Sequence, residues 1–318
     1  MEKRKLGKSG LEIAPLVLGG NVFGWTADEP RSFAILDAFV GAGFNMIDTA
    51  DVYSVWAPGN KGGESETVIG NWLKKRGARD KVLVATKVGY ELSPTHKGLK
   101  KSYILSEVET SLKRLKTDYI DLYWSHIDDP TTAVDETLSA HDQLVKQGKV
   151  RAIGASNFGA PRLKESLDTS RKQGYPRYQG LQPLYNLSDR EEFEAELEPL
   201  CEKEGLGVLT YFSLASGFLT GKYRSESDLA KSPRGQGVKK YLDARGLRIL
   251  GALDEVAQAK RATPAQVALA WLMTRPAIAA PIASATSVGQ LVELMGSARL
   301  ALDRESIERL DRASSPRG

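Results

Sequence analysis

Short apolar runs rich in β-branched residues alternate along the chain with longer segments in which apolar residues recur every three or four positions. Runs of the first kind are typical of buried strands, and segments of the second kind are typical of amphipathic helices. Ile104, Val108 and Leu112, for example, fall on one face of a predicted helix. The predicted strands are 15–19, 44–48, 81–86, 119–124, 150–154, 178–182, 207–211 and 279–283.

This alternation predicts the fold class. Strands that alternate with helices at this spacing form parallel sheets, and eight such units predict an α/β (β/α)₈ TIM barrel rather than an open sheet. Residues 1–13 predict a small N-terminal β-hairpin that caps the bottom of the barrel, and the chain is expected to finish with a C-terminal helix. Residues 213–242 form a long polar connection, which predicts a disordered segment or a functional lid. The whole chain, 1–318, is interpreted as a single domain.

Composition narrows the function classes. The chain has 318 residues, of which 41% are hydrophobic and 26% charged, as expected for a protein with a sizeable core. One cysteine, Cys201, excludes an internal disulfide, and three scattered histidines do not suggest a metal site. The net charge of +4 is dispersed, so neither nucleic acid nor a membrane is an expected partner. The N-terminus has no apolar stretch typical of a secretory signal, so a cytoplasmic location is expected.

Two familiar nucleotide-binding motifs are absent. The glycines of "GGNVFG" at 19–24 are not spaced as in a G-x-G-x-x-G turn, and "GFLTGKY" is too short for a phosphate-binding loop. If the protein binds a nucleotide, it does so without a Rossmann unit.

Four ionisable side chains follow three successive predicted strands. Asp48 and Tyr53 follow the second strand, Lys87 the third and His126 the fourth. Active residues of a barrel lie at the C-terminal ends of its strands, so we expect these four to meet at one mouth. Alone, each is more often structural: a packed tyrosine, a helix cap, a surface charge or a core histidine. Their joint placement favours a catalytic role.

The four residue types suit one reaction. A phenol titrates near pH 10 and donates a proton poorly until its anion is stabilised. Lys87 would stabilise that anion at Tyr53, and Asp48 would keep the lysine charged and in place. His126 would then hydrogen-bond a carbonyl oxygen. The set therefore predicts proton delivery to a carbonyl oxygen while hydride reaches the carbon.

The motifs "NMIDTADVYS", "ATKVG", "DLYWSHID", "IGASNF", "LQPLYNL" and "GFLTGKY" occur in an order and spacing that resembles the aldo-keto reductase superfamily along nearly the whole chain. The resemblance implies a barrel that binds NADP(H) in an extended form and reduces a small-molecule aldehyde or ketone. It implies Tyr53 as the general acid, Asp48 and Lys87 as its tuning residues, and His126 as the group that orients the carbonyl. It leaves the oligomeric state open.

The same resemblance implies the cofactor contacts. Ser156, Asn157 and Gln182 are expected to bind the nicotinamide carboxamide, and Tyr211 to stack on the ring. NADPH-selective relatives often carry a lysine and an arginine where this chain has Ser284 and Gln290, and an asparagine where it has Leu294. NADPH stays the favoured cofactor, with NADH as the alternative, because fixed cations that would grip a 2′-phosphate are missing here. The other expected cofactor residues are Phe212, Leu214, Ser216, Gly217, Leu219 and Lys222 on the pyrophosphate loop, and Thr286, Ser287 and Glu293 at the adenosine end.

Aromatic residues near the strand ends predict a substrate pocket, with Phe23, Trp25, Trp56 and Trp124 as candidate walls. Two further ionisable residues are interpreted as structural. His141 lies on an apolar helical face and is expected to pack in the core, and Asp51 is expected to act as a local cap or turn residue.

Two other functions remain open. Channel-associated members of the superfamily bind cofactor but turn over slowly, so a cofactor-sensing regulatory subunit is the alternative to a reductase. A Schiff-base aldolase with Lys87 as nucleophile is the third reading, although it gives Tyr211, Gln182, Ser156 and Asn157 no task.

Overall fold

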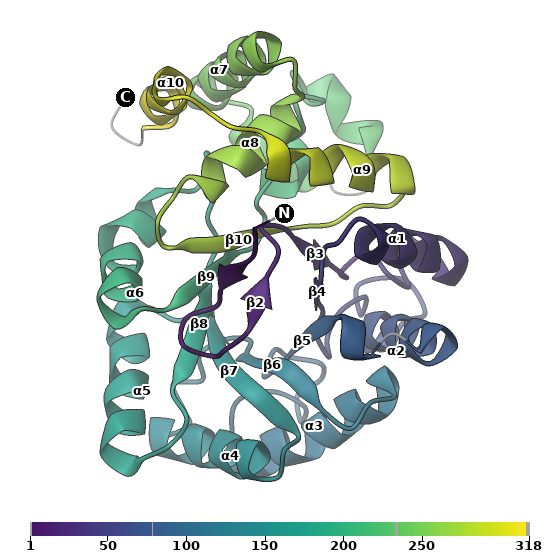
Figure 1. Ribbon diagram of the computed structural model, residues 1–318, viewed down its shortest axis with the longest axis vertical. Coiled ribbons are helices and arrows are strands. Elements are labelled where there is room, and N and C mark those ends of the chain that lie inside the picture. The colour runs from purple at the N-terminus through teal and green to yellow at the C-terminus, as the bar shows by residue number, and fades with distance from the viewer. Residues whose placement is uncertain (1, 78, 233–234, 316–318) are drawn as a thin grey trace.

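Eight parallel strands close into a barrel in the computed structural model, which describes residues 2–77, 79–232 and 235–315 (Figure 1). Each predicted strand is present, and the (β/α)₈ fold is confirmed. Around the barrel the strands run in the order β10, β3, β4, β5, β6, β7, β8 and β9. Their bounds are β3 Val17–Gly19, β4 Met46–Asp48, β5 Leu83–Val88, β6 Ile120–Ser125, β7 Val150–Ser156, β8 Tyr178–Gln182, β9 Gly207–Thr210 and β10 Ile278–Ala283.

Helices surround the barrel because the apolar face of each packs on the outward side chains of the strands. The face predicted for the third helix is buried, including Ile104, Val108 and Leu112. Gly205 ends the sixth helix in a left-handed conformation. The helices are α1 Glu29–Gly41, α2 Glu64–Arg76, α3 Lys101–Leu115, α4 Val134–Lys146, α5 Ala160–Gln173, α6 Glu198–Glu204, α7 Ala244–Lys260, α8 Pro264–Met273, α9 Val288–Gly296 and α10 Arg304–Ser314; shorter turns are η1 Arg79–Lys81, η2 Phe193–Leu197 and η6 Ser297–Arg299.

The predicted N-terminal hairpin closes the bottom of the barrel. Its strands, β1 (Arg4–Lys5) and β2 (Glu12–Ile13), pair antiparallel and lie across the barrel in Figure 1. Leu6, Leu11 and Ile13 pack on the side chains that fill the barrel interior. Gly7 sits so close to the bottom of β8 that an added Cβ would lie 2.2 Å from the Gln179 carbonyl oxygen. The opposite end of the barrel, where the strands have their C-terminal ends, stays free of the hairpin and holds the candidate active site.

The interior of the barrel is filled by a large aromatic ring. Trp124 on β6 is fully buried, and a Cβ added to Gly154 on β7 would lie 2.3 Å from its indole. Glycine on the neighbouring strand therefore makes the space that the tryptophan occupies.

The long polar connection after β9 is built from three short 3₁₀ helices, η3 (Ala215–Thr220), η4 (Glu226–Lys231) and η5 (Gly235–Tyr241). Leu229, Val238 and Tyr241 are buried from this segment, and η3 and η5 pack on each other. Over its described residues, the segment packs on the rest of the protein, so the alternative of a disordered segment was wrong because the scattered apolar residues supply anchors. The alternative of a functional lid stays a prediction.

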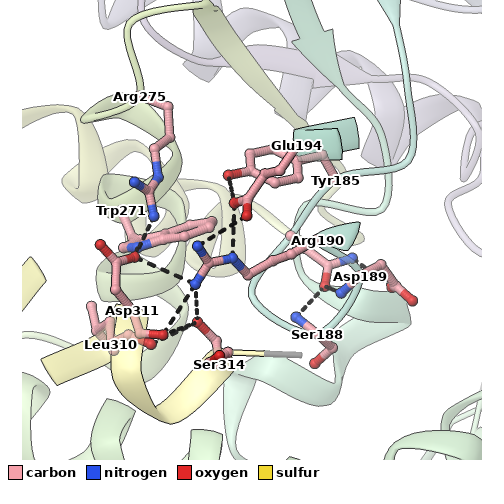
Figure 2. A network of polar contacts seen from close by, with 12 residues as sticks. Tyr185, Ser188, Asp189, Arg190, Glu194, Trp271, Arg275, Leu310, Asp311 and Ser314 are labelled. Atoms are coloured by element: carbon pink, nitrogen blue, oxygen red, sulfur yellow. Dashed lines mark hydrogen bonds and ion pairs between the residues drawn. The ribbon is translucent and has the colours of Figure 1, made fainter. Parts of the chain in front are cut away.

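The C-terminal helix α10 is present and is tied to the segment that follows β8 (Figure 2). Arg190 donates hydrogen bonds to the Asp311 carbonyl and to Ser314 Oγ, and it also pairs with Glu194. Asp311 accepts hydrogen bonds from Trp271 and Arg275 of the neighbouring α8 region. Hydrogen bonds to charged groups contribute more than neutral ones, so this network fixes α10 against the barrel.

Candidate active site

The four predicted catalytic side chains meet at the C-terminal end of the barrel. Asp48 is the last residue of β4, Lys87 is the last residue but one of β5, and His126 follows β6 directly. Tyr53 lies on the loop after β4. Adjacent parallel strands are in register here, with Asp48 beside Ala85 and Lys87 beside Trp124. The strand register therefore brings residues far apart in sequence to one place.

Lys87 is the centre of this group. Its Nζ donates hydrogen bonds to Asp48 Oδ2 at 2.5 Å, to the Thr49 carbonyl at 2.7 Å and to the Tyr53 hydroxyl at 2.9 Å. An ammonium has three protons, so these three acceptors satisfy all of its donors. Gln182 donates from Nε2 to the other oxygen of Asp48 at 3.0 Å. The lysine is thereby held in one orientation, pointing at the phenol.

Burial and charge act in opposite directions on Lys87. Burial disfavours the ammonium, but the charge of Asp48, the oxygen of Tyr53 and their hydrogen bonds outweigh it, so the pKa of Lys87 is raised above its ordinary value. Lys87 and Asp48 are both almost completely buried. The result is a fixed positive charge beside the Tyr53 oxygen, which is what stabilises a phenolate.

His126 packs beside Tyr53. Its ring centroid lies 6.1 Å from that of Tyr53 in an edge-to-face arrangement. Burial, and then the charge of Lys87, lower the pKa of His126 well below 6.5. Its ring is therefore neutral at physiological pH, and it carries one proton that it can donate to an oxygen placed in the mouth.

The expected nicotinamide residues form a continuous hydrogen-bonded chain next to the catalytic group. Tyr211 donates to Asn157 Oδ1 at 2.7 Å, and Asn157 donates from Nδ2 to the His126 carbonyl at 2.9 Å. Ser156 Oγ donates to the Gln182 carbonyl at 2.9 Å. Asn157 has a positive φ of 55°, a strained conformation typical of functional positions. All four side chains therefore lie at the same mouth as Lys87.

The expected pyrophosphate loop begins with an exposed aromatic residue. Phe212 is 47% exposed. Its backbone has a positive φ of 49°, and φ is also positive at Ser216 (57°) and Gly217 (99°). Leu214 accepts hydrogen bonds from the N–H groups of Gly217 and Leu219, while Lys222 is exposed. Leu219 is fully buried in the core. Its side chain therefore packs inside the protein, contrary to the expected cofactor contact, because η3 turns it inward.

The expected adenosine end lies at the start of α9. Ser287 caps this helix by accepting from the Gln290 N–H, and Gln290 Oε1 accepts from the N–H and hydroxyl of Thr286. Ser284 Oγ donates to Asn21 Oδ1 at 2.5 Å. Glu293 contributes its carbonyl to Gln266. The side chains that line this stretch from Ser284 to Gln290 are neutral.

Two of the four predicted pocket walls stand at the mouth. Trp25 and Trp56 meet edge to face with ring centroids 5.8 Å apart, and Trp56 lies 6.0 Å from Tyr53. Trp56 is 46% exposed. Phe23 and Trp124, by contrast, are fully buried. Both were wrong as pocket walls, because Phe23 packs in the core between the barrel and its helices and Trp124 fills the barrel interior.

Sequence reasoning missed Tyr90, which also stands at the mouth. Its ring centroid lies 5.1 Å from that of His126, and the side chain is 45% exposed. Tyr90 follows β5 by two residues, after Gly89 in a left-handed conformation. An aromatic residue directly after the strand that carries Lys87 was the signal that could have found it. Trp56 thus stands beside Tyr53, and Tyr90 stands beside His126.

The chain that forms this barrel matches a known enzyme family. A family model described as Aldo/keto reductase family matches residues 15–315, so the chain belongs to the aldo-keto reductase family and is an oxidoreductase. Members of this family typically use nicotinamide cofactors and act on small-molecule carbonyl compounds.

Three similar proteins are named as an oxidoreductase, a reductase and a channel subunit. The chain is 34% identical to a protein named uncharacterized oxidoreductase YrpG of Bacillus subtilis, over 98% of this chain and 95% of that one. It is 30% identical to the norsolorinic acid reductase of Aspergillus flavus, over 96% and 79% of the two chains. It is 34% identical to a probable voltage-gated potassium channel subunit beta of Oryza sativa, over 93% and 90%.

Two features of the described residues concern membranes and metal ions. Within those residues, no helix is long and apolar enough to cross a membrane. The same part of the chain holds no cluster of three or more His, Cys, Asp or Glu side chains that could bind a metal ion.

Proposed function

We propose that the protein reduces aldehydes or ketones to alcohols with NAD(P)H, using Tyr53 as the general acid. The observation that carries the proposal is the buried ammonium of Lys87, which bonds both Asp48 and the Tyr53 hydroxyl at the mouth of the barrel. This arrangement stabilises a negative charge on the phenol oxygen and so favours loss of its proton.

In the proposed reaction, a bound nicotinamide supplies a hydride to the carbonyl carbon. Tyr53 gives its proton to the carbonyl oxygen, and Lys87 stabilises the phenolate that remains until solvent returns the proton. Asp48 holds Lys87 in place and keeps it charged. His126, which is neutral, donates a hydrogen bond to the carbonyl oxygen and fixes its orientation.

The residues present fit a nicotinamide. Asn157, Ser156 and Gln182 place amide and hydroxyl groups beside the catalytic lysine, which suits a carboxamide. Tyr211 stands next to them with its hydroxyl held by Asn157, so its ring is fixed for stacking on a planar heterocycle. This support comes from neutral hydrogen-bonding groups, as a carboxamide requires.

NADPH is the favoured cofactor on family grounds, and NADH is the alternative. Ser284 and Gln290 offer hydrogen bonds but no fixed charge to a 2′-phosphate. A small-molecule carbonyl substrate and a cytoplasmic location are part of the same proposal.

The similarity to a probable potassium channel subunit beta keeps one other function in view. A cofactor-sensing regulatory subunit would bind the nicotinamide as tightly but turn over slowly. Its site would need the same hydrogen bonds, so turnover decides between the two.

The test is the initial rate of NADPH oxidation, and separately of NADH oxidation, by the purified protein with aromatic, aliphatic and sugar aldehydes and with bulky ketones. Rapid turnover supports the reductase, and the ratio of the two rates gives the cofactor preference. Tight cofactor binding without turnover on any of these substrates contradicts the reductase and favours the regulatory subunit.

A further inference from the structure

Asp51 is a buried carboxyl group that the proposed reaction does not use. It lies on the loop between β4 and α2, two residues before Tyr53, and its backbone N–H donates to the Lys87 carbonyl at 3.3 Å. Its side chain is fully buried, and neither carboxyl oxygen has a hydrogen-bond partner among the described residues. The turn position is as predicted, but the side chain is not a cap.

The groups around Asp51 carry an excess of negative charge. Glu66 on α2 accepts a hydrogen bond from Thr86 Oγ1 at 2.6 Å and pairs with Arg114 on α3 at 3.1 Å. Arg114 also pairs with Glu107, again at 3.1 Å. The two ion pairs of Arg114 therefore go to Glu66 and Glu107, and neither goes to Asp51.

Burial, and then the charges of Glu66 and Glu107, raise the pKa of Asp51 well above its usual range. The Val52 N–H and Arg114 act in the opposite direction but more weakly. Burial without hydrogen-bond partners disfavours an ionised carboxylate and favours the neutral acid. A neutral acid carries an O–H donor as well as an acceptor.

Two tyrosine hydroxyls share this space with Asp51. Tyr123 on β6 lies beside Thr86 in the strand register, and Thr86 bonds Glu66. Tyr103 lies one turn before Glu107 on α3, and burial raises the pKa of both tyrosine hydroxyls. Neither hydroxyl has a hydrogen-bond partner within the described chain, and the same is true of Ser111 Oγ on α3. The Tyr123 ring packs edge to face on His141 of α4. Buried polar groups of native proteins are almost always hydrogen-bonded, to protein or to internal water.

We propose that Asp51 is a positioning residue, held as the neutral acid and hydrogen-bonded through internal water to Tyr103 and Tyr123. It acts through the loop that it shares with Tyr53. The anchored side chain and the bond from its N–H to the Lys87 carbonyl hold residues 49–54 at the strand end, so that the Tyr53 hydroxyl stays within reach of the Lys87 ammonium. The effect on turnover rests on the function proposed above, whereas the protonation state does not.

Infrared spectroscopy tests the protonation state without any assay of activity. The difference spectrum of wild type minus Asp51→Asn at neutral pH should show the C=O stretch of a carboxylic acid that shifts in D₂O. Loss of carboxylate bands instead would overturn the proposal. Tyr123→Phe provides a second route if Asp51→Asn does not fold, because removing a partner of the acid should shift this band, and an unshifted band would contradict the hydrogen-bonded network.

Stability gives an independent check of the same point. The folded protein keeps the Asp51 proton while the unfolded chain loses it near pH 4, so wild type loses stability relative to Asp51→Asn as pH rises above about 4. The melting temperature of Asp51→Asn should therefore exceed that of wild type by a margin that grows from pH 4 to pH 7. A margin that shrinks over this range would show that Asp51 is ionised in the fold.

Turnover separates positioning from simple packing. Asp51→Asn keeps both hydrogen-bonding functions and should retain kcat, whereas Asp51→Ala should lower kcat by about 10- to 100-fold with little change in the binding of NADPH. Equal kcat values for the two variants would overturn the positioning role. If wild type itself shows no turnover, the reductase proposal fails, but the infrared and melting experiments still decide the state of Asp51.

Discussion

Lys87 donates a 2.9 Å hydrogen bond from a fully buried ammonium group to the hydroxyl of Tyr53. The bond joins the end of β5 to the loop after β4, and the two residues are 34 positions apart in sequence. It makes Tyr53 the acid of the proposed reaction and Lys87 the group that stabilises its anion.

Tyr53→Phe should lower the rate of carbonyl reduction by about 100-fold or more, because the variant lacks the proton donor. Cofactor binding should survive, since the ring and the Asn157 and Gln182 groups are unchanged. Single-turnover kinetics and NADPH titration by fluorescence measure the two quantities. Reduction at the wild-type rate would remove Tyr53 from its proposed role.

Lys87→Met should destabilise the protein by about 3–5 kcal/mol, because it leaves Asp48 buried without its cation. Adding Asp48→Asn to the same chain should restore much of this stability by removing the uncompensated charge, but activity should stay low. Urea denaturation of the single and double variants provides the comparison. A double variant that is less stable than Lys87→Met would show that the pair is not the source of the loss.

We expect buried His141 to make the free energy of unfolding fall at acidic pH. Burial lowers the pKa of this histidine from 6.5 to about 4. Between pH 6.5 and 4, His141 is therefore protonated in the unfolded chain but stays neutral in the folded protein. Stability is complete above pH 6.5 and is lost as pH falls to 4, by about 3 kcal/mol from this group. In His141→Gln the free energy of unfolding should depend less on pH over this range, and the same change at exposed His96 is the matched control. An unaltered pH dependence in His141→Gln would contradict the assignment.

Trp56→Ala should weaken the binding of aromatic substrates. The exposed ring beside Tyr53 offers one face for contact with a planar substrate, and an aromatic contact of about 1 kcal/mol corresponds to several-fold in KM. The KM for aromatic aldehydes should rise by about 3- to 10-fold, with little change for short aliphatic aldehydes. An equal rise in KM for aromatic and aliphatic aldehydes would indicate that the substitution disturbs the loop, not that it removes an aromatic contact with the substrate.

Gln290→Arg should favour NADPH over NADH. Gln290 is exposed at the start of α9, in the neutral stretch from Ser284 to Gln290, and an arginine there would pair with a phosphate in bidentate fashion. The KM for NADPH should fall by about 10-fold, more at low salt than at high salt, while the KM for NADH stays the same. Equal effects on both cofactors would place the 2′-phosphate elsewhere.

The position of the catalytic group could be predicted because it depends on strand order and strand ends. Asp48, Lys87 and His126 each stand at the end of an apolar run, and parallel strands in a closed barrel bring their carboxyl ends to one mouth. Tyr90 escaped prediction because an aromatic residue on a loop has no periodic pattern to mark which way it faces. The hydrogen bonds of Lys87, however, required the register of β4 against β5.

The sequence alone determined the eight strands, the barrel and the identity of the residues at its mouth, since hydrophobic period and chain order are local properties. Only the tertiary structure decided which neighbours each side chain has. It buries the side chains of Phe23 and Trp124 in the core, and it places Asp51 among Glu66, Glu107 and two tyrosines. The reason is physical: burial and Coulomb interactions depend on distances between elements that are remote in sequence, and so no local pattern encodes them.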